Sequence, residues 1–108
     1  MRVLALCLAL AGVSACTFSS AVGYGPAAPA RDPARVPVIA GTRLERPYDV
    51  VGHVVTQKDG TDPREAADEL RRLAAALGAD AVIGVTLELG FGVWNVGQHL
   101  FGTAVRYR

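Results

Sequence analysis

The chain has 108 residues, of which 11 are Lys or Arg and 10 are Asp or Glu, giving a formal net charge of +1. This near balance gives no electrostatic reason to expect nucleic acid or an anionic lipid surface as a partner. The sequence also lacks a glycine-rich phosphate loop, a nucleophile elbow, a metalloprotease helix and a paired-acid arrangement, so we expect no enzyme activity.

The first 15 residues are typical of a signal peptide. Arg2 supplies a positive charge, and residues 3–13 form an apolar run that is too short to span a bilayer as a helix. The run ends in Val-Ser-Ala-Cys at residues 13–16, which resembles the lipobox of bacterial lipoproteins. Cys7 lies within the signal, so the mature chain keeps Cys16 alone. We expect cleavage before Cys16 and lipid attachment to its thiol; the alternative is an ordinary secretory signal in which this cysteine is incidental.

The residues after the cysteine predict the location of the protein. Thr17 stands where an Asp would keep a lipoprotein in the inner membrane, so we expect a lipid-anchored protein of the cell envelope. In a Gram-negative host it would lie in the outer membrane and face the periplasm. Residues 16–35 are rich in Pro, Gly and small residues and have no helical or strand period, which predicts a mobile tether.

Residues 36–108 have the pattern of one small α+β domain, near the lower size limit for a self-sufficient core. Residues 48–56 are dense in β-branched side chains and precede a turn-like Lys-Asp-Gly, which predicts a strand. Residues 36–39 could add a short edge strand, limited by Pro37.

A helix is predicted from residue 63 onward. Asp62 is the expected N-cap, Pro63 the first helical residue, and Glu65 is placed to close a capping box. Gly78 supplies the stop. One apolar stripe runs along the helix, formed by Ala66, Leu70, Leu73, Ala74 and Leu77. The opposite face carries charges that we interpret as a solvated surface with local ion pairs: Arg64, Asp68, Arg71 and Arg72.

Two further strands are predicted over residues 81–89 and 98–107, joined by a hairpin tip at residues 90–97. One face of the first of these strands is expected to carry Ala81, Ile83, Val85, Leu87 and Leu89. The tip contains Phe91 and Trp94 and almost no charge, so it would mark a contact with a partner protein, another subunit or a membrane if exposed. The alternative is that these rings fold back over the sheet as core.

A family resemblance adds to this pattern. Leu-Arg-Arg-Leu-Ala-Ala-Ala-Leu-Gly-Ala-Asp-Ala-Val-Ile-Gly-Val at residues 70–85, followed by Phe-Gly-Thr-Ala-Val-Arg at residues 101–106, resembles the YbjQ-like family, which is catalogued as heavy-metal-binding domains. The resemblance covers about residues 48–107. It implies a three-stranded antiparallel sheet in the order 1-3-2 on one helix, often assembled into a pentameric ring. The matching positions, which we interpret as structural, are Gly52, Gly78, Ala79, Asp80, Ala81, Gly84, Gly102 and Thr103.

A more distant resemblance is to the outer-membrane lipoprotein that senses envelope stress for the Rcs pathway. That protein relies on disulfides, which this chain lacks. Asp80 is interpreted as a turn residue that bonds to nearby amides rather than as a catalytic carboxylate.

The heavy-metal label of the family needs its own ligands, because a fold does not supply them. A soft metal requires thiolates or several imidazoles at close spacing, and the sequence offers His53 and His99. Antiparallel pairing of the first and last strands would set His99 beyond His53. We therefore expect no cofactor and at most weak binding of a divalent metal.

The sequence predicts a membrane-tethered, non-catalytic interaction or envelope-sensing lipoprotein, with a periplasmic heavy-metal-binding protein as the alternative. Both faces of the first and last strands carry apolar residues, while one short helix can cover only one face. We therefore expect a homo-oligomer, such as a closed pentameric ring, and an envelope protein of unknown identity as a further partner.

Overall fold

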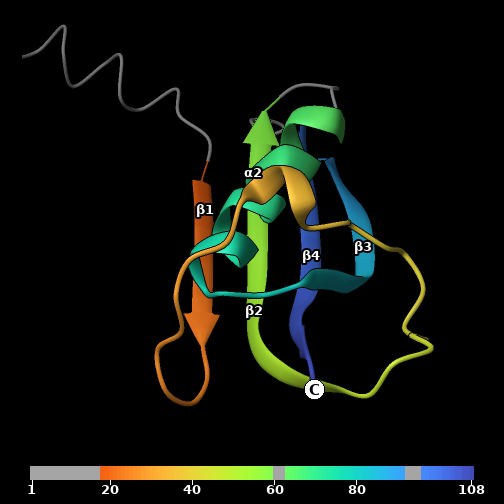
Figure 1. Cartoon of the computed structure of the whole chain (residues 1–108). Coiled ribbons are helices and arrows are strands. Elements are labelled where there is room, and N and C mark those ends of the chain that lie inside the picture. Colours follow the sequence, from red (N-terminus) through yellow and green to blue (C-terminus); the bar gives the residue numbers. More distant parts are fainter. Residues whose placement is uncertain (1–17, 60–62, 92–95) are drawn as a thin grey trace, which may run out of the picture.

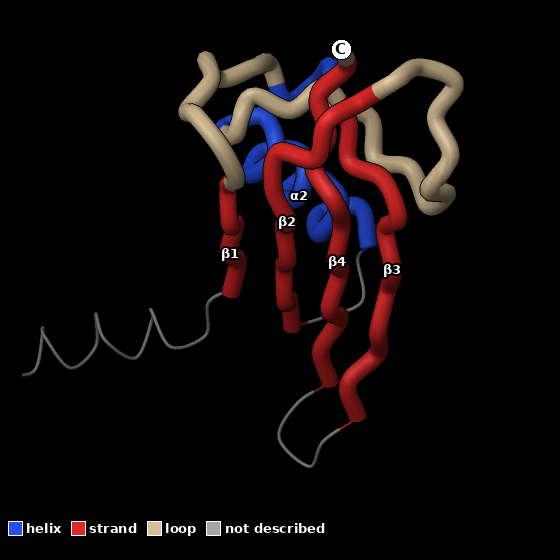
Figure 2. Tube along the Cα trace, turned by 90° about the horizontal axis from the view of Figure 1, so that it is seen from below, coloured by secondary structure: helices blue, strands red, loops and turns tan. Residues whose placement is uncertain are grey.

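Four antiparallel strands form one sheet, and one α-helix covers one of its faces (Figures 1 and 2). The structure, a computed structural model, describes residues 18–59, 63–91 and 96–108. In the described ranges, no helix is long and apolar enough to cross a membrane. In chain order the elements are β1 (Phe18–Gly23), the 3-10 helix η1 (Pro33–Arg35), β2 (Tyr48–Asp59), α2 (Pro63–Ala76), β3 (Ala81–Phe91) and β4 (Val96–Tyr107).

The α+β class is confirmed, but the prediction of a three-stranded sheet is wrong. The strand order is β1-β2-β4-β3, so the expected order 1-3-2 holds for β2, β4 and β3. The extra strand, β1, lies inside residues 16–35, where the sequence predicts a tether. It pairs antiparallel with β2, from Phe18 opposite Gln57 to Gly23 opposite Gly52. From residue 18 to residue 23, the expected tether is therefore part of the sheet.

Side-chain and backbone contacts hold β1 in place. The Ser19 hydroxyl donates to Glu69 on α2 at 3.0 Å, and the amide just beyond the strand, that of Tyr24, donates to the Val51 carbonyl at 2.8 Å. Gly23 lies so close to Leu77 that a Cβ added to this glycine would stand 2.9 Å from the Leu77 Cδ2 atom. The small residues of β1 thus let the strand approach the end of the helix.

The short strand expected over residues 36–39 is reduced to one parallel bridge, between Val38 and Val82. The Ile39 amide donates to the Val82 carbonyl at 2.8 Å, and the Val82 amide donates to the Pro37 carbonyl at 2.9 Å. Pro37 has no amide hydrogen to donate, which limits a longer ladder. This segment nevertheless lies along the outer edge of β3.

Helix α2 buries the predicted apolar stripe. Ala66, Leu70 and Ala74 are fully buried against the sheet, and Leu73 and Leu77 are partly buried beside them. The expected N-cap, Asp62, lies outside the described residues. On the solvent side, Arg71 pairs with Asp68 at 2.6 Å, and Glu69 binds Arg72. The hydrogen bond to Glu69 raises the pKa of Arg72 above its ordinary value.

The helix ends in a left-handed glycine. Gly78 has φ of 76°, its amide donates to the Ala75 carbonyl at 3.0 Å, and the Ala79 amide donates to the Ala74 carbonyl at 3.0 Å. This pair of bonds is a Schellman motif, which satisfies carbonyls at the end of a helix. It turns the chain directly into β3.

A β-bulge in β3 overturns the predicted assignment of its faces. Ile83 lies opposite Thr103, but the next pair is Thr86 with Phe101, so β3 contains one extra residue there. Gly84 lies in this step with φ of 62°. One extra residue reverses the alternation of side chains. Val85 therefore packs with Val82 in the core cluster under the helix, while Ala81 and Ile83 belong to a separate cluster.

The second cluster shows how the chain covers part of the face opposite the helix. Ala81, Ile83 and Val105 are buried, and Ile39 and Leu44 pack on them. Residues 36–47 reach this position by running around the β3 edge of the sheet (Figure 1). One end of the second face is thus covered by the chain itself, which removes part of the reason for predicting a ring.

One polar atom in the core predicts a stabilising substitution. Thr56 is fully buried, and its hydroxyl has no hydrogen-bond partner within the described part of the chain. Valine has the same shape without the polar atom, so Thr56→Val is expected to raise the free energy of unfolding by about 1 kcal/mol. Equilibrium urea denaturation measures this. The matched control is Thr86→Val, at an exposed residue whose hydroxyl donates to the Gly84 carbonyl at 3.3 Å, and no gain is expected there.

Candidate functional site

Among the residues that the structure describes, none covers the face of the sheet opposite α2 over β1, β2 and the middle of β4. We call this surface the open face, and its residues are Ser20, Val22, His53, Val55 and Phe101. They come from neighbouring positions, because Ser20 pairs with Val55, Val22 with His53, and Val55 with Phe101. Val22 is 55% exposed and Phe101 is 37% exposed. The open face is therefore mainly apolar, with large side chains in contact with solvent.

The open face is hollowed. A depression of about 270 Å³ is lined by its five residues together with Val54 and Gly102. A Cβ on Gly102 would point the other way, toward Val82 and Val54 in the core cluster under the helix, so the side chains of the open face shape this hollow. An apolar hollow with one imidazole at its side is a surface on which an apolar side chain of another molecule could bind.

His53 forms the polar side of this hollow. A hydrogen bond of 2.7 Å joins its Nδ1 atom and the hydroxyl oxygen of Tyr24. The two rings also meet edge to face, with centroids 5.3 Å apart and planes at 71°. Tyr24 follows directly after β1, so the pairing of β1 with β2 brings these two residues together. The contact fixes the imidazole at one end of the open face.

The structure does not bring the two histidines together. His53 lies opposite Thr103 on β4, and His99 lies four residues away along that strand, a distance of roughly 13 Å. The His99 ring stacks on Phe101 instead, with centroids 6.2 Å apart. Across the described ranges, no group of three or more His, Cys, Asp or Glu side chains comes together.

The residues from Gly78 to Asp80 form a junction between the end of the helix and two other parts of the chain. One Asp80 oxygen accepts from the Tyr107 amide at 2.8 Å, and the other lies 3.2 Å from Arg31 Nε. The Nε atoms of Arg31 and Arg106 donate to the Gly78 carbonyl at 3.2 and 3.1 Å. Two cations at the carbonyl end of a helix are favourable for its dipole. Asp80 thus ties the helix end to β4 and to the N-terminal segment.

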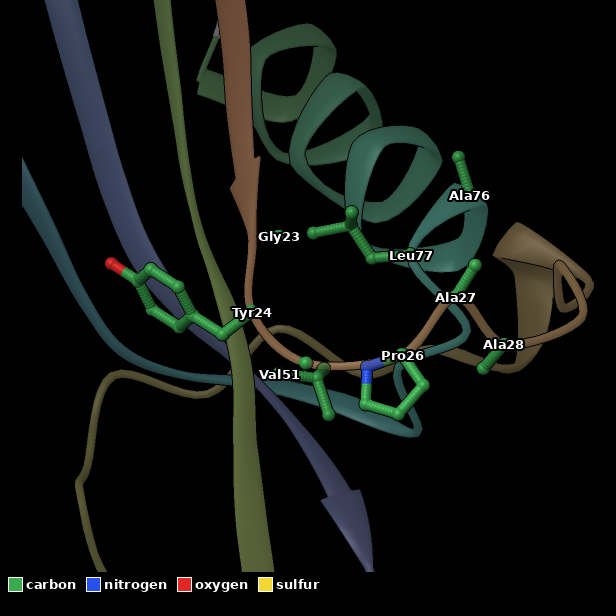
Figure 3. Close-up of a pocket in the computed structure, with 9 residues that line it drawn as sticks. Gly23, Tyr24, Pro26, Ala27, Ala28, Val51, Ala76 and Leu77 are labelled. Atoms are coloured by element: carbon green, nitrogen blue, oxygen red, sulfur yellow. The ribbon is translucent and has the colours of Figure 1, made fainter.

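A second hollow, of about 230 Å³, lies between the end of α2 and the turn after β1. Leu77 points from the helix toward Gly23, while the Tyr24 ring lies on the other side of the sheet (Figure 3). The other lining residues are small or apolar, so this hollow presents no titratable side chain. It is a product of the close packing of β1 on the helix.

Comparisons with known proteins give one result on the fold. No family model and no curated protein matches the chain. A crystal structure of the Francisella virulence factor FvfA, in its orthorhombic form, superposes with a TM-score of 0.65 and 21% sequence identity. The match covers 82% of this chain and 97% of that chain. The two proteins share a fold. The resemblances to the YbjQ-like family and to the Rcs lipoprotein stay predictions.

The structure places the candidate contact residues of the sequence analysis only in part. Phe91 is the last residue of β3, and only its backbone belongs to the part of the chain that the structure describes. Trp94 and Cys16 lie outside the described residues. Sequence reasoning missed Val22 and Tyr24, because both belong to the segment predicted to be a tether. It noted apolar side chains on both faces of β2 and β4, and that signal pointed to the open face.

Proposed function

We propose that this chain is a lipid-anchored, non-catalytic binding module of the cell envelope that holds a protein partner on its open face. The observation that supports this is the solvent-exposed apolar surface around Val22 and Phe101, with its hollow of about 270 Å³. A contiguous apolar patch of this kind on a small domain is typical of a binding surface, and aromatic side chains are enriched in such contacts.

The anchoring half of the proposal rests on the sequence. The signal-like first 15 residues and Cys16 supply the attachment, and Thr17 favours the outer membrane of a Gram-negative host. Heavy-metal binding, the alternative function, has no supporting observation in the described ranges, since His53 and His99 are far apart. The photocrosslinking experiment described next distinguishes another protein on the open face from a second copy of this chain.

Site-specific photocrosslinking in the producing cells tests the open face. A benzoylphenylalanine at position 101 is expected to give one defined adduct, because Phe101 borders the hollow. The same group at Arg72, exposed on the far side of the helix, is the matched control and should give none. An adduct of twice the protein mass would identify a second copy, and light scattering on the purified protein would then report an oligomer. A folded protein without an adduct at position 101 would contradict the proposal.

Val22→Ser measures the energetic contribution of the open face. Val22 is 55% exposed, so its loss should leave the urea midpoint of the domain nearly unchanged. Binding of the crosslinked partner, once purified, is expected to weaken about ten-fold, which corresponds to about 1.4 kcal/mol. Unchanged affinity would place the binding surface elsewhere.

Cys16→Ala tests the anchor. The substitution is expected to abolish incorporation of an alkyne-labelled fatty acid, because the thiol that accepts the lipid is gone. Precursor or a soluble secreted form should accumulate in its place. Cys7→Ala is the control and should keep normal labelling. Equal labelling of the Cys16→Ala protein would show that this chain is not a lipoprotein of the expected kind.

A further inference from the structure

Strand β1 is the outermost strand on its side of the sheet (Figure 2). The Tyr24 amide donates to the Val51 carbonyl, and these two residues continue the β1–β2 register by one step, so they form a hydrogen-bonded pair. In an antiparallel ladder, such pairs alternate with pairs that share no hydrogen bond. Ser19, Ala21 and Gly23 belong to the second kind, so their N–H and C=O groups turn away from β2 toward the outer edge.

These outward groups are unpaired in the part of the chain that the structure describes. None of them makes a backbone hydrogen bond there, and Ala21 and Gly23 are exposed. The edge formed by β3 differs, because residues 37–41 make hydrogen bonds to the backbone of residues 82–85. The fold thus covers part of one edge of the sheet, while the described residues leave the β1 edge free.

The sequence of β1 does nothing to block this edge. Natural sheets protect an exposed edge with charged side chains, a proline or a bulge. Residues 18–23 read Phe-Ser-Ser-Ala-Val-Gly, with neither charge nor proline, and they pair with β2 without a shift of register. The edge of β1 can therefore accept another strand.

A second copy of β1 is complementary to this edge. A two-fold axis perpendicular to the sheet sets two copies antiparallel, with Ala21 of one copy opposite Ala21 of the other. Ser19 of each copy then lies opposite Gly23 of the other. This register uses all three outward-facing residues of each strand, and each of these pairs exchanges two hydrogen bonds.

The side chains are compatible with this register. Ser19 contacts Glu69 on α2, whereas Ser20 and Val22 line the hollow of the open face. On the open face, Val22 of each copy, which is 55% exposed, would lie beside the small Ser20 of the other. On the helix side the register brings together only Ser, Ala and Gly, so the two backbones can approach. The formal net charge of +1 adds little repulsion between copies.

We propose that this protein forms a two-fold dimer through the edge of β1, which joins two sheets into one continuous sheet. Both helices then lie on one side of this sheet and both open faces on the other. A symmetric contact of this kind closes at two copies, unlike the ring that the family resemblance implies. The dimer does not depend on a partner on the open face, because Phe101 on β4 is separated from β1 by β2.

A cysteine at the axis tests this register. The Cα atoms of a hydrogen-bonded antiparallel pair stand about 5.5 Å apart, within the usual range for a disulfide. Ala21→Cys in the full chain, oxidised mildly in the producing cells, is therefore expected to convert most of the protein into a disulfide-linked dimer on a non-reducing gel. Ala34→Cys, at an exposed alanine of η1, is the matched control, and neither it nor the parent chain should give this dimer.

A charge at the axis tests the association without a crosslink. Sedimentation velocity on the purified parent protein is expected to give twice the mass of one chain. Ala21→Lys should give the mass of one chain, because two lysines would face each other across the axis. Ala34→Lys should remain a dimer. Ala21 is exposed, so an unchanged circular dichroism spectrum is expected to show that its lysine variant is folded.

A parent protein with the mass of one chain, and no disulfide at position 21, would overturn the dimer. It would leave the proposed function standing, since crosslinking through position 101 reports on a different surface. A disulfide between Ala21→Cys and a different protein would also overturn it, because the edge would then hold a foreign strand. Equal dimer yields from cysteines at positions 21 and 34 would do the same, because random collision would then explain both.

Discussion

Replacing Gly102 with alanine is expected to lower the free energy of unfolding by about 3 kcal/mol, near the upper end for overpacked cores. A Cβ at this position would overlap the Val82 Cγ1 atom and stand 3.3 Å from Val85 Cγ2 and 3.7 Å from Val54 Cγ2. Valine has few rotamers to offer, so relief requires the strands themselves to move. Equilibrium urea denaturation of a chain that begins at residue 17 measures the loss.

Gly41→Ala is the matched control for this substitution. A Cβ at Gly41 would meet no atom within 4 Å, and its φ is not in the left-handed region. Its urea midpoint should equal that of the parent or exceed it slightly, because alanine restricts the unfolded chain. If Gly102→Ala were as stable as Gly41→Ala, the close contact of Gly102 with the Val82 side chain would be wrong.

Removing β1 is the second change with a large expected effect. A chain that begins at residue 25 loses the ladder from Phe18 to Gly23 and the hydrogen bond from Ser19 to Glu69. Backbone groups of β2 then lose their partners, and Leu77 loses the cover of Gly23. With each hydrogen bond contributing about 1 kcal/mol, we expect a loss of about 3 kcal/mol or more.

The comparison is with a chain that begins at residue 17, which keeps β1 and omits the predicted signal and Cys16. Thermal unfolding followed by circular dichroism should show a clearly lower midpoint for the shorter chain. Equal midpoints would mean that β1 adds nothing to the stability of the folded domain.

The sequence predicts most of the fold because its local patterns agree with each other. Asp62, Pro63 and Gly78 bracket the helix, and the observed helix runs from Pro63 to Ala76. The β-branched run after Tyr48 predicts β2, although the observed strand continues to Asp59. The order of β2, β4 and β3 came from the family resemblance and could not be derived from periodicity.

Two features escaped prediction because they depend on neighbours far away in the chain. Residues 18–23, Phe-Ser-Ser-Ala-Val-Gly, have little strand propensity of their own, and β1 forms because β2 offers an edge. The bulge at Gly84 depends on its φ of 62°, which an alternating pattern does not reveal. The bulge moved Val85 to the face opposite the one predicted for it.

The candidate site was predictable to a smaller extent. Phe101 and His53 could be placed on strands, but not beside Val22, since that requires knowing that β1 is a strand and that it pairs with β2. The covering of Ala81 and Val105 by Ile39 and Leu44 was equally out of reach, because it depends on the path of residues 36–47 around the sheet. The extent of the open face therefore follows from tertiary structure alone.

The antiparallel pairing of β1 with β2 has a mechanical consequence. If the proposed lipid anchor and the proposed partner pull on the domain, the force enters it at Phe18 and runs along β1. Interstrand hydrogen bonds lie perpendicular to antiparallel strands, so a pull along the strand shears all of them together instead of opening them one by one. Under the proposed anchoring, β1 is thus loaded in the direction in which a sheet resists rupture best, and the domain can stay folded under that tension.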